Sequence, residues 1–309
     1  MRVTDGPLHG AFVMAPYGYV NWYFAASALI HFTDDIPDEA AAFVDAYLRH
    51  VETDGTISDY VPDYWNENGG VPRRQAPDSH DSYAAMLVAL ASKLGLHPSR
   101  RTWFNQRKDA LKRIVARNIL DSQNPETGLV RTFQDPSQPD WCPGVEYLMD
   151  NCEVFYGLRL FAEALEAVGD PSWASMRDAA DRVAAGIRTL FRSDSGAWAH
   201  ASQAAEVGTM FYPFATGQAF PVAFEVPVEP ETTDAGWTYL ENTAPLWWKG
   251  GRYDHFPWFV LGHAAALRGD RDAATTQLNS GFKYIRANPL AFTIAELGHW
   301  HATVRAMSS

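Results

Sequence analysis

The sequence has few cysteines, no long apolar run and no excess of positive charge. Cys142 and Cys152 are the only cysteines in 309 residues, so neither a disulfide scaffold nor a four-cysteine zinc site is expected. No run of about 18 apolar residues is present, which argues against a membrane-spanning helix. The 37 acidic residues outnumber the 25 basic ones, for a formal net charge of −12. No block of lysine or arginine stands out, so nucleic acid is a poor partner.

Several common site signatures are missing too. There is no G-x-G-x-x-G after a strand, no G-K-[ST] loop and no G-x-S-x-G turn, so we expect no cofactor. The first ten residues, MRVTDGPLHG, lack the basic and apolar regions of a secretory signal. We therefore expect a cytoplasmic protein with two reduced thiols. The oligomeric state is left open.

The helical patterns come in pairs. Residues 173–191 carry apolar side chains at spacings of three and four, with charged residues elsewhere. This pattern predicts an amphipathic helix with one solvent-exposed face. Residues 154–168 are apolar in most directions, which is typical of a buried helix. The same sequence of patterns occurs at 82–94 and 99–120. Each pair predicts a buried inner helix followed by a solvent-facing outer helix.

Two turn signals repeat along the chain. Glycine-containing turns join inner to outer helices at 94–103, 168–176 and 268–276, where glycine suits the residue just beyond a helix end. A second glycine follows each outer helix, at steps of 73 and 68 residues (128 − 55 and 196 − 128). Self-similarity of this kind indicates a repeat architecture.

About eleven helices are expected. Their starts lie near residues 20, 37, 79, 98, 147, 171, 207, 235, 255, 270 and 290. Together they predict one all-α domain over residues 1–309, in which five or six hairpins close into an (α/α)6 toroid, either complete or one helix short.

The turns LGLHPS and VGDPSW, the return TGLVRTF and the aromatic-rich starts of the inner helices resemble the six-hairpin glycosidase superfamily. The resemblance covers nearly the whole chain and is nearest to the unsaturated glycuronyl hydrolase-like members. It implies an (α/α)6 toroid that cleaves a glycosidic bond in an oligosaccharide or glycoconjugate.

Two pairs of carboxylates open the second and third expected inner helices. Asp78 and Asp81 form one pair, and Asp150 and Glu153 form the other; each pair shares a helix face. Because inner helices start at one mouth of a toroid, acids from separate helices can converge there. A glycosidase needs a carboxylic acid to protonate the leaving oxygen and a carboxylate as base or nucleophile.

The resemblance also suggests roles for these acids. In unsaturated glycuronyl and related hydrolases, aspartates at the second and third inner-helix starts carry acid/base chemistry, and Asp81 and Asp150 occupy similar places. We predict Asp150 as the proton donor and Asp81 as its partner, without a metal.

Side chains around the same mouth are expected to bind the carbohydrate. Aromatic faces bury the apolar side of a pyranose while a polar edge still hydrogen-bonds. The expected substrate-binding residues are Asp78, His80, Tyr83, Trp65, Trp141, Tyr147, Asn151, Glu153, Tyr212, Asp254 and His255.

Other interpretations of the toroid stay open. Each carboxylate pair also fits a capping box at a helix start. A non-catalytic sugar-binding toroid would have Asp81 and Asp150 pointing apart as simple caps. Polysaccharide lyases and epimerases share the scaffold, and a lyase would use a Tyr or His base such as Tyr83, His80 or Tyr212.

Two further motifs suggest metals. Asp34-Asp35-Ile36-Pro37-Asp38 fits the DDxxD motif with which terpenoid synthases bind Mg²⁺ and diphosphate, although Pro37 favours a helix break. His299-Trp300-His301 has two histidines two residues apart, on opposite sides of a helix, which favours a structural role.

Overall fold

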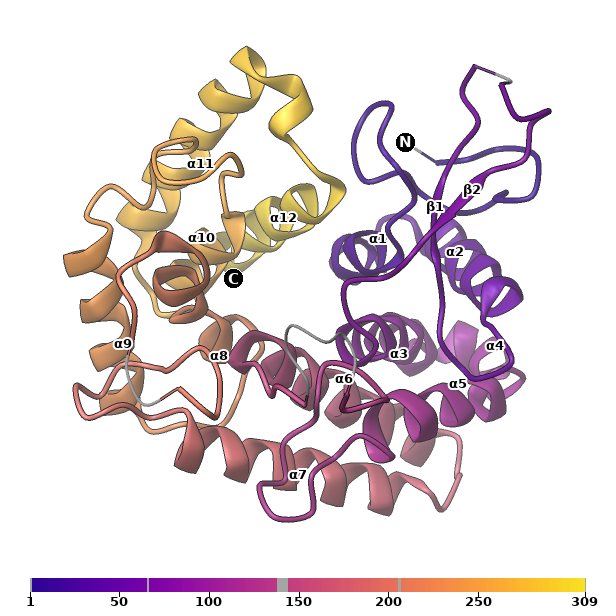
Figure 1. The fold of residues 1–309 in the computed structure, drawn as a ribbon, viewed down its shortest axis with the longest axis horizontal. Helices are drawn as coiled ribbons and strands as arrows, with labels where there is room; N and C mark the ends of the chain where they lie inside the picture. Colours follow the sequence, from indigo (N-terminus) through magenta and orange to yellow (C-terminus); the bar gives the residue numbers. More distant parts are fainter. Residues whose placement is uncertain (1, 66, 138–143, 205–206, 309) are drawn as a thin grey trace.

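The computed structural model describes residues 2–65, 67–137, 144–204 and 207–308. Within these ranges six helices form an inner ring, in which each helix packs on the next and the last packs on the first (Figure 1). The inner helices are α1 Trp22–Leu29, α3 Asp81–Leu96, α6 Leu148–Ala167, α8 Phe220–Ala223, α10 Phe259–Leu267 and α12 Ile294–Ser308.

An outer layer surrounds this ring. Its helices are α2 Pro37–His50, α4 Arg101–Asn105, α5 Lys108–Val115 with the π-helical turn η2 Ala116–Leu120, α7 Trp173–Leu190, α9 Pro230–Thr243 and α11 Arg271–Ala287. Shorter helical turns are η1 Pro98–Arg100, η3 Phe211–Ala215 and η4 Pro289–Ala291. Within the described part of the chain, no helix has both the length and the apolar character needed to cross a lipid bilayer.

The alternation of inner and outer helices confirms the predicted toroid. Helix α6 is buried over most of its length, whereas α7 buries one stripe and exposes the other face. Among the described residues, six inner helices are joined by five outer segments, which is one outer helix short of six full hairpins.

Three local features differ from the sequence prediction. The expected helix over 99–120 is broken into α4 and α5. Gly95 does not end a helix: it lies inside α3, where an added Cβ would meet the ring of Phe104. The strands β1 Asp59–Val61 and β2 Arg73–Gln75 form an antiparallel hairpin that local patterns did not indicate.

The inner helices α3 and α6 pack tightly against each other at a glycine. A Cβ added to Gly157 of α6 would lie 2.5 Å from the carbonyl oxygen of Ala85 in α3. Small residues at this crossing let the two backbones come together, and close packing leaves no slack for an extra methyl group. The acid-bearing starts of α3 and α6 are therefore held side by side.

Gly157→Ala is expected to lower the free energy of unfolding by about 1–3 kcal/mol, because the new methyl group meets backbone that has no room to move. Gly217→Ala is the matched control, since its Cβ would make only ordinary contacts at 3.9 Å. Urea unfolding of both variants checks this. An unchanged midpoint for Gly157→Ala would show that α3 and α6 are not in close contact.

Candidate active site

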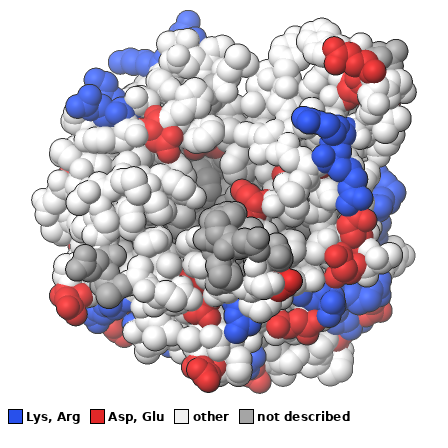
Figure 2. Space-filling model, viewed as in Figure 1, with Lys and Arg blue, Asp and Glu red and all other residues white. Residues whose placement is uncertain are grey.

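The inner helices begin at one end of the ring. Each outer segment carries the chain back, so successive inner helices run in the same direction. Asp81 is the first residue of α3, and Asp150 and Glu153 lie within the first six residues of α6. The face in Figure 2 is hollowed near its middle, and acidic side chains (red) lie along part of the hollow.

Asp150 and Asp78 are the members of the predicted pairs that solvent reaches. Asp150 is partly exposed and accepts a hydrogen bond from the hydroxyl of Thr132 at 3.1 Å. Burial raises the pKa of Asp150 to about 7, and the negative charge of Asp78 acts in the same direction. Asp78 is exposed, yet surrounding protein desolvates its carboxylate and raises its pKa.

The other two acids of these pairs, Asp81 and Glu153, are buried. Asp81 is fully buried; one oxygen accepts from the backbone N–H of Ser82 at 2.8 Å, and the other has no hydrogen-bond partner among the described residues. Glu153 is buried and accepts a hydrogen bond from the hydroxyl of Tyr23. Burial, and next the charge of Asp150, raise the pKa of both acids well above their usual range. Burial therefore favours the neutral form of both carboxyl groups.

The acid pairs do not form capping boxes. The N-cap residues of α3 and α6 are His80 and Tyr147, and neither makes a side-chain capping hydrogen bond. Asp150 is bound by Thr132, which precedes α6 by many residues. Helix capping therefore does not account for this concentration of carboxyl groups.

A further acid, Asp59 of β1, joins the cluster and was missed by sequence reasoning. The hydroxyl of Tyr83 donates to it at 2.8 Å, and the amide of Asn21 donates to both Asp59 and Tyr83, at 3.1 and 2.8 Å. Burial raises the pKa of Asp59 to about 7, with the Tyr83 hydrogen bond opposing the rise. Tyr83 is 1% exposed, so its contact is with Asp59 and not with a substrate.

An aromatic pair lies close to these acids. Tyr212 is half exposed and stacks on Trp258, with ring centroids 5.1 Å apart. The pKa of Tyr212 is raised to about 12, by burial first and then by the charges of Asp150 and Asp78. Its phenol therefore lies within the electrostatic reach of the acid cluster and keeps its proton.

Trp258 is held from two directions. Its indole N–H donates to Asp254 at 2.8 Å, and its backbone N–H donates to Glu296 at 3.2 Å. Glu296, in the first turn of α12, also accepts from the backbone N–H of Phe259 at 2.7 Å, and burial raises its pKa to about 7. Asp254 therefore acts on the aromatic pair by fixing Trp258. A carboxylate in the first turn of an inner helix is the signal that could have identified Glu296.

Two of the predicted binding residues, His80 and Asn151, form hydrogen bonds with the loop that contains Thr132. The Nδ1 atom of His80 accepts from the backbone N–H of Gln134 at 3.2 Å. Asn151 is fully buried, and its amide bonds to backbone groups of Val130 and Tyr147. The geometry thus gives both residues a supporting role, because these hydrogen bonds tie them to backbone groups of neighbouring segments.

The remaining predicted residues are spread around the cluster. Tyr147 packs near His200, at 6.4 Å between ring centroids. Trp65 is 75% exposed and stacks on Tyr17 at 6.5 Å. His255 is exposed, and its carbonyl accepts from the hydroxyl of Tyr284. Trp141 lies outside the described residues.

The DDxxD motif does not form a diphosphate site. Asp34 and Asp35 lie in the turn between α1 and α2, and Pro37 begins α2, so the aspartates do not share one helix. Asp34 pairs with Arg305 at 3.0 Å, Asp35 with His301 at 3.3 Å, and Asp38 with Arg100. These contacts use the carboxylates at the protein surface, and the terpenoid synthase interpretation loses its geometric basis.

No family model matches the chain, and no curated protein matches it. Several solved structures, in contrast, are similar to the chain in fold. A rhamnosidase from Klebsiella oxytoca with rhamnose bound has a TM-score of 0.67 at 11% identity, over 99% of this chain and 65% of that one. A GH63 mannosylglycerate hydrolase from Thermus thermophilus, in complex with glucose, has a TM-score of 0.59 at 12% identity, over 98% and 96%. The fold is that of the six-hairpin glycosidases.

Coverage differs among these toroids. An α-L-rhamnosidase from Aspergillus terreus has a TM-score of 0.58 at 16% identity, and the match covers 89% of this chain but 35% of that one. The chain thus spans about a third to two thirds of the two rhamnosidases. At 11–16% identity the likeness concerns the fold. The nearer resemblance to unsaturated glycuronyl hydrolases stays a prediction.

The raised pKa of Asp150 has a consequence for stability. The folded state holds this proton up to about pH 7, while the unfolded chain releases it near 3.8, so the carboxyl group costs stability as pH rises from about 4 to 7. The asparagine in Asp150→Asn does not titrate, so it does not cause this loss of stability. The free energy of unfolding of Asp150→Asn minus that of wild type should therefore increase between pH 5 and 7 and then level off.

Urea unfolding at pH 5, 6, 7 and 8 measures this difference. Asp178→Asn, at an exposed aspartate of the outer helix α7, is the control and should keep a constant difference from wild type. A pH-independent difference for Asp150→Asn would mean that Asp150 titrates as an ordinary surface acid.

Proposed function

We propose that the protein hydrolyses a glycosidic bond in an oligosaccharide or glycoconjugate, with Asp150 as the proton donor. The observation that carries the proposal is that Asp150 combines access to solvent with a pKa near 7. A general acid works best when its pKa lies near the working pH, because it then holds a proton and still releases it readily.

Asp78 is the better candidate for the second carboxylate. Asp81, the partner predicted from the sequence, is fully buried and its pKa is raised by that burial, whereas Asp78 is exposed. Asp150 would donate its proton to the glycosidic oxygen as the bond to the anomeric carbon breaks. Asp78 would then activate a water molecule or attack that carbon itself, depending on the separation of the two carboxyl groups.

The aromatic pair supports a carbohydrate substrate. Tyr212 presents a half-exposed ring beside the acids, and Trp258 holds that ring in place by stacking. An aromatic face of this kind suits the apolar side of a sugar ring. The similar solved structures include one with rhamnose bound and one in complex with glucose, so proteins that share this fold do bind sugars.

The lyase alternative has less support. A lyase needs an accessible base in its unprotonated form. Tyr83 is buried and donates its hydroxyl hydrogen to Asp59, and the Nδ1 atom of His80 already accepts a hydrogen bond from the backbone N–H of Gln134. Tyr212 faces the acids, and its pKa of about 12 keeps the phenol protonated. Hydrolysis by carboxyl groups therefore fits the electrostatics better.

Asp150→Asn should lower kcat by about 10²–10⁴-fold while leaving the fold intact, because the amide cannot donate the required proton. Turnover is measured on a panel of natural oligosaccharides and 4-nitrophenyl glycosides. Asp178→Asn, far from the mouth on α7, should keep wild-type kcat. Wild-type turnover by Asp150→Asn would falsify the assignment of the donor.

The pH profile gives a second test. Protonated Asp150 disappears above its pKa, so kcat/KM should fall about tenfold per pH unit above about pH 7. Initial rates from pH 5 to 9 on the best substrate of the panel provide the measurement. A kcat/KM that stays constant up to pH 9 would exclude an acid with this pKa.

A further inference from the structure

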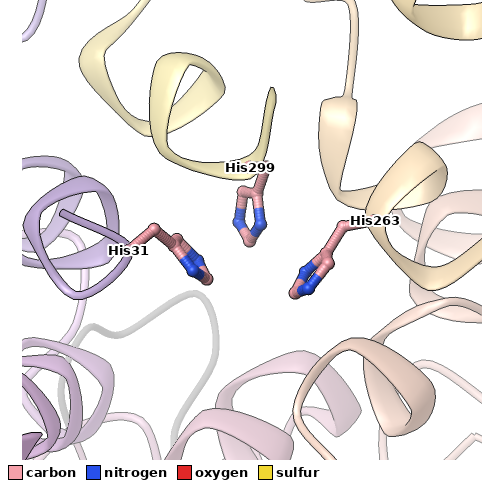
Figure 3. Close-up of side chains that lie close together, drawn as sticks. All are labelled: His31, His263 and His299. Atoms are coloured by element: carbon pink, nitrogen blue, oxygen red, sulfur yellow. The ribbon is translucent and has the colours of Figure 1, made fainter. Parts of the chain in front are cut away.

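Three histidines meet where the inner ring closes. His31 follows α1, His263 lies in α10 and His299 lies in α12, and all three side chains point into one shared space (Figure 3). Each contributes one ring nitrogen to a set in which all the atoms lie within 4.8 Å of one another. Ring centroids are 5.2 Å apart for His31 and His299, and 5.4 Å for His31 and His263.

This cluster is separate from the acid site. Glu296, which binds the start of α10, precedes His299 by about one helical turn, so His299 lies about 5 Å further along α12 than Glu296. Among the described residues, no carboxylate or thiolate belongs to the cluster. None of the three histidines takes part in the proposed hydrolysis.

The environment keeps these imidazoles neutral. Burial lowers the pKa of His263 to about 4 and that of His299 to about 3, and it lowers the pKa of His31 well below the usual range. The charge of Lys93 adds to the lowering at His31 and His263. A neutral imidazole has a free lone pair, which is the form that binds a metal ion.

Two of the ring nitrogens lack partners. His263 is 9% exposed, and within the described ranges the Nδ1 atoms of His263 and His299 are buried without a hydrogen-bond partner. A buried polar atom that gives up water without gaining a partner is costly, and such atoms are rare in folded proteins. A bound metal ion would supply a partner for each nitrogen that it contacts.

The ligand set selects the kind of metal. Three neutral histidines are the protein ligands of many zinc sites that keep a fourth position for water. Mg²⁺ and Ca²⁺ prefer oxygen ligands, and among the described residues the cluster contains no carboxylate. Zinc–nitrogen bonds of about 2.1 Å place tetrahedral ligands roughly 3.4 Å apart, so binding requires the ring nitrogens, now within 4.8 Å of one another, to move closer together.

We propose that His31, His263 and His299 bind one zinc ion. The ion joins α1 to α10 and α12, and so ties the first inner helix to the last two at the closure of the ring. Because binding requires the folded ring, zinc raises the melting temperature of the protein.

Metal content tests the site directly. Untagged full-length protein is stripped with a chelator, dialysed against micromolar ZnCl₂ and analysed by mass spectrometry for zinc. Wild type should retain about one zinc ion per chain and melt several degrees higher than the stripped protein, whereas MgCl₂ should give no shift. A zinc content near zero would overturn the proposal.

Variants locate the ion. His263→Gln and His299→Gln should lose the zinc and the melting shift. His301→Gln is the matched control, because His301 lies on the same helix but contacts Asp35, and it should retain both. Retention of zinc by His263→Gln and His299→Gln alike would place the ion elsewhere and contradict the site.

Cobalt provides a readout that does not depend on how the variants fold. Co²⁺ added to stripped wild-type protein should give the intense visible absorption bands of a tetrahedral nitrogen site, and zinc should displace them. Weak bands typical of hexahydrated cobalt would overturn the proposal even if His263→Gln and His299→Gln failed to fold.

Discussion

The burial of several carboxyl groups at one end of a ring of parallel helices is the constraint on which the site depends. The close contact of α3 and α6 at Gly157 holds two acid-bearing helix starts together. Asp81 and Glu153 lie out of water beside Asp150, and like charges at such short range cannot all persist. Burial raises the pKa of the inner acids Asp81 and Glu153 well above the usual range, and it raises that of the partly exposed Asp150 to about 7.

Two electrostatic effects oppose each other at these helix starts. The positive end of a helix dipole favours a carboxylate and lowers its pKa, by an amount that corresponds to about 0.3–1 kcal/mol at exposed positions. Desolvation favours the neutral acid. The pKa values of Asp81, Asp150 and Glu153 all move upward, and desolvation is the largest cause for each, so burial outweighs the dipole. For Asp150 this balance gives a pKa of about 7.

The arrangement of inner and outer helices, and the positions of the acids at two inner-helix starts, could be predicted from the sequence. Apolar periodicity separated α6 from α7, and the carboxylates of the second and third inner helices fell where the two starts meet. These features are local, because helix amphipathicity depends on spacings of three and four residues. The opposite directions of His299 and His301 on α12 also followed from helix geometry, and His301 does contact Asp35.

Contacts between distant segments could not be predicted in this way. Glu153 is bound by Tyr23 from 130 residues earlier in the chain, and Asp59 reaches Tyr83 through a strand hairpin without a local signal. The three histidines come from distant parts of the chain and share no spacing, so their sequence positions did not indicate that they meet. Such groupings are set by how the ring closes, which no local pattern encodes.

The protonation of Asp150 is the point that decides whether this mouth is built for acid catalysis. Carbon-13 NMR of aspartate carboxyl groups, with the Asp150 signal assigned by its loss in Asp150→Asn, measures that titration directly. A midpoint near pH 7 is the predicted result. A midpoint near 3.8, the ordinary value for an aspartate, would contradict it, because Asp150 would then be an ionised side chain with no proton to donate at neutral pH.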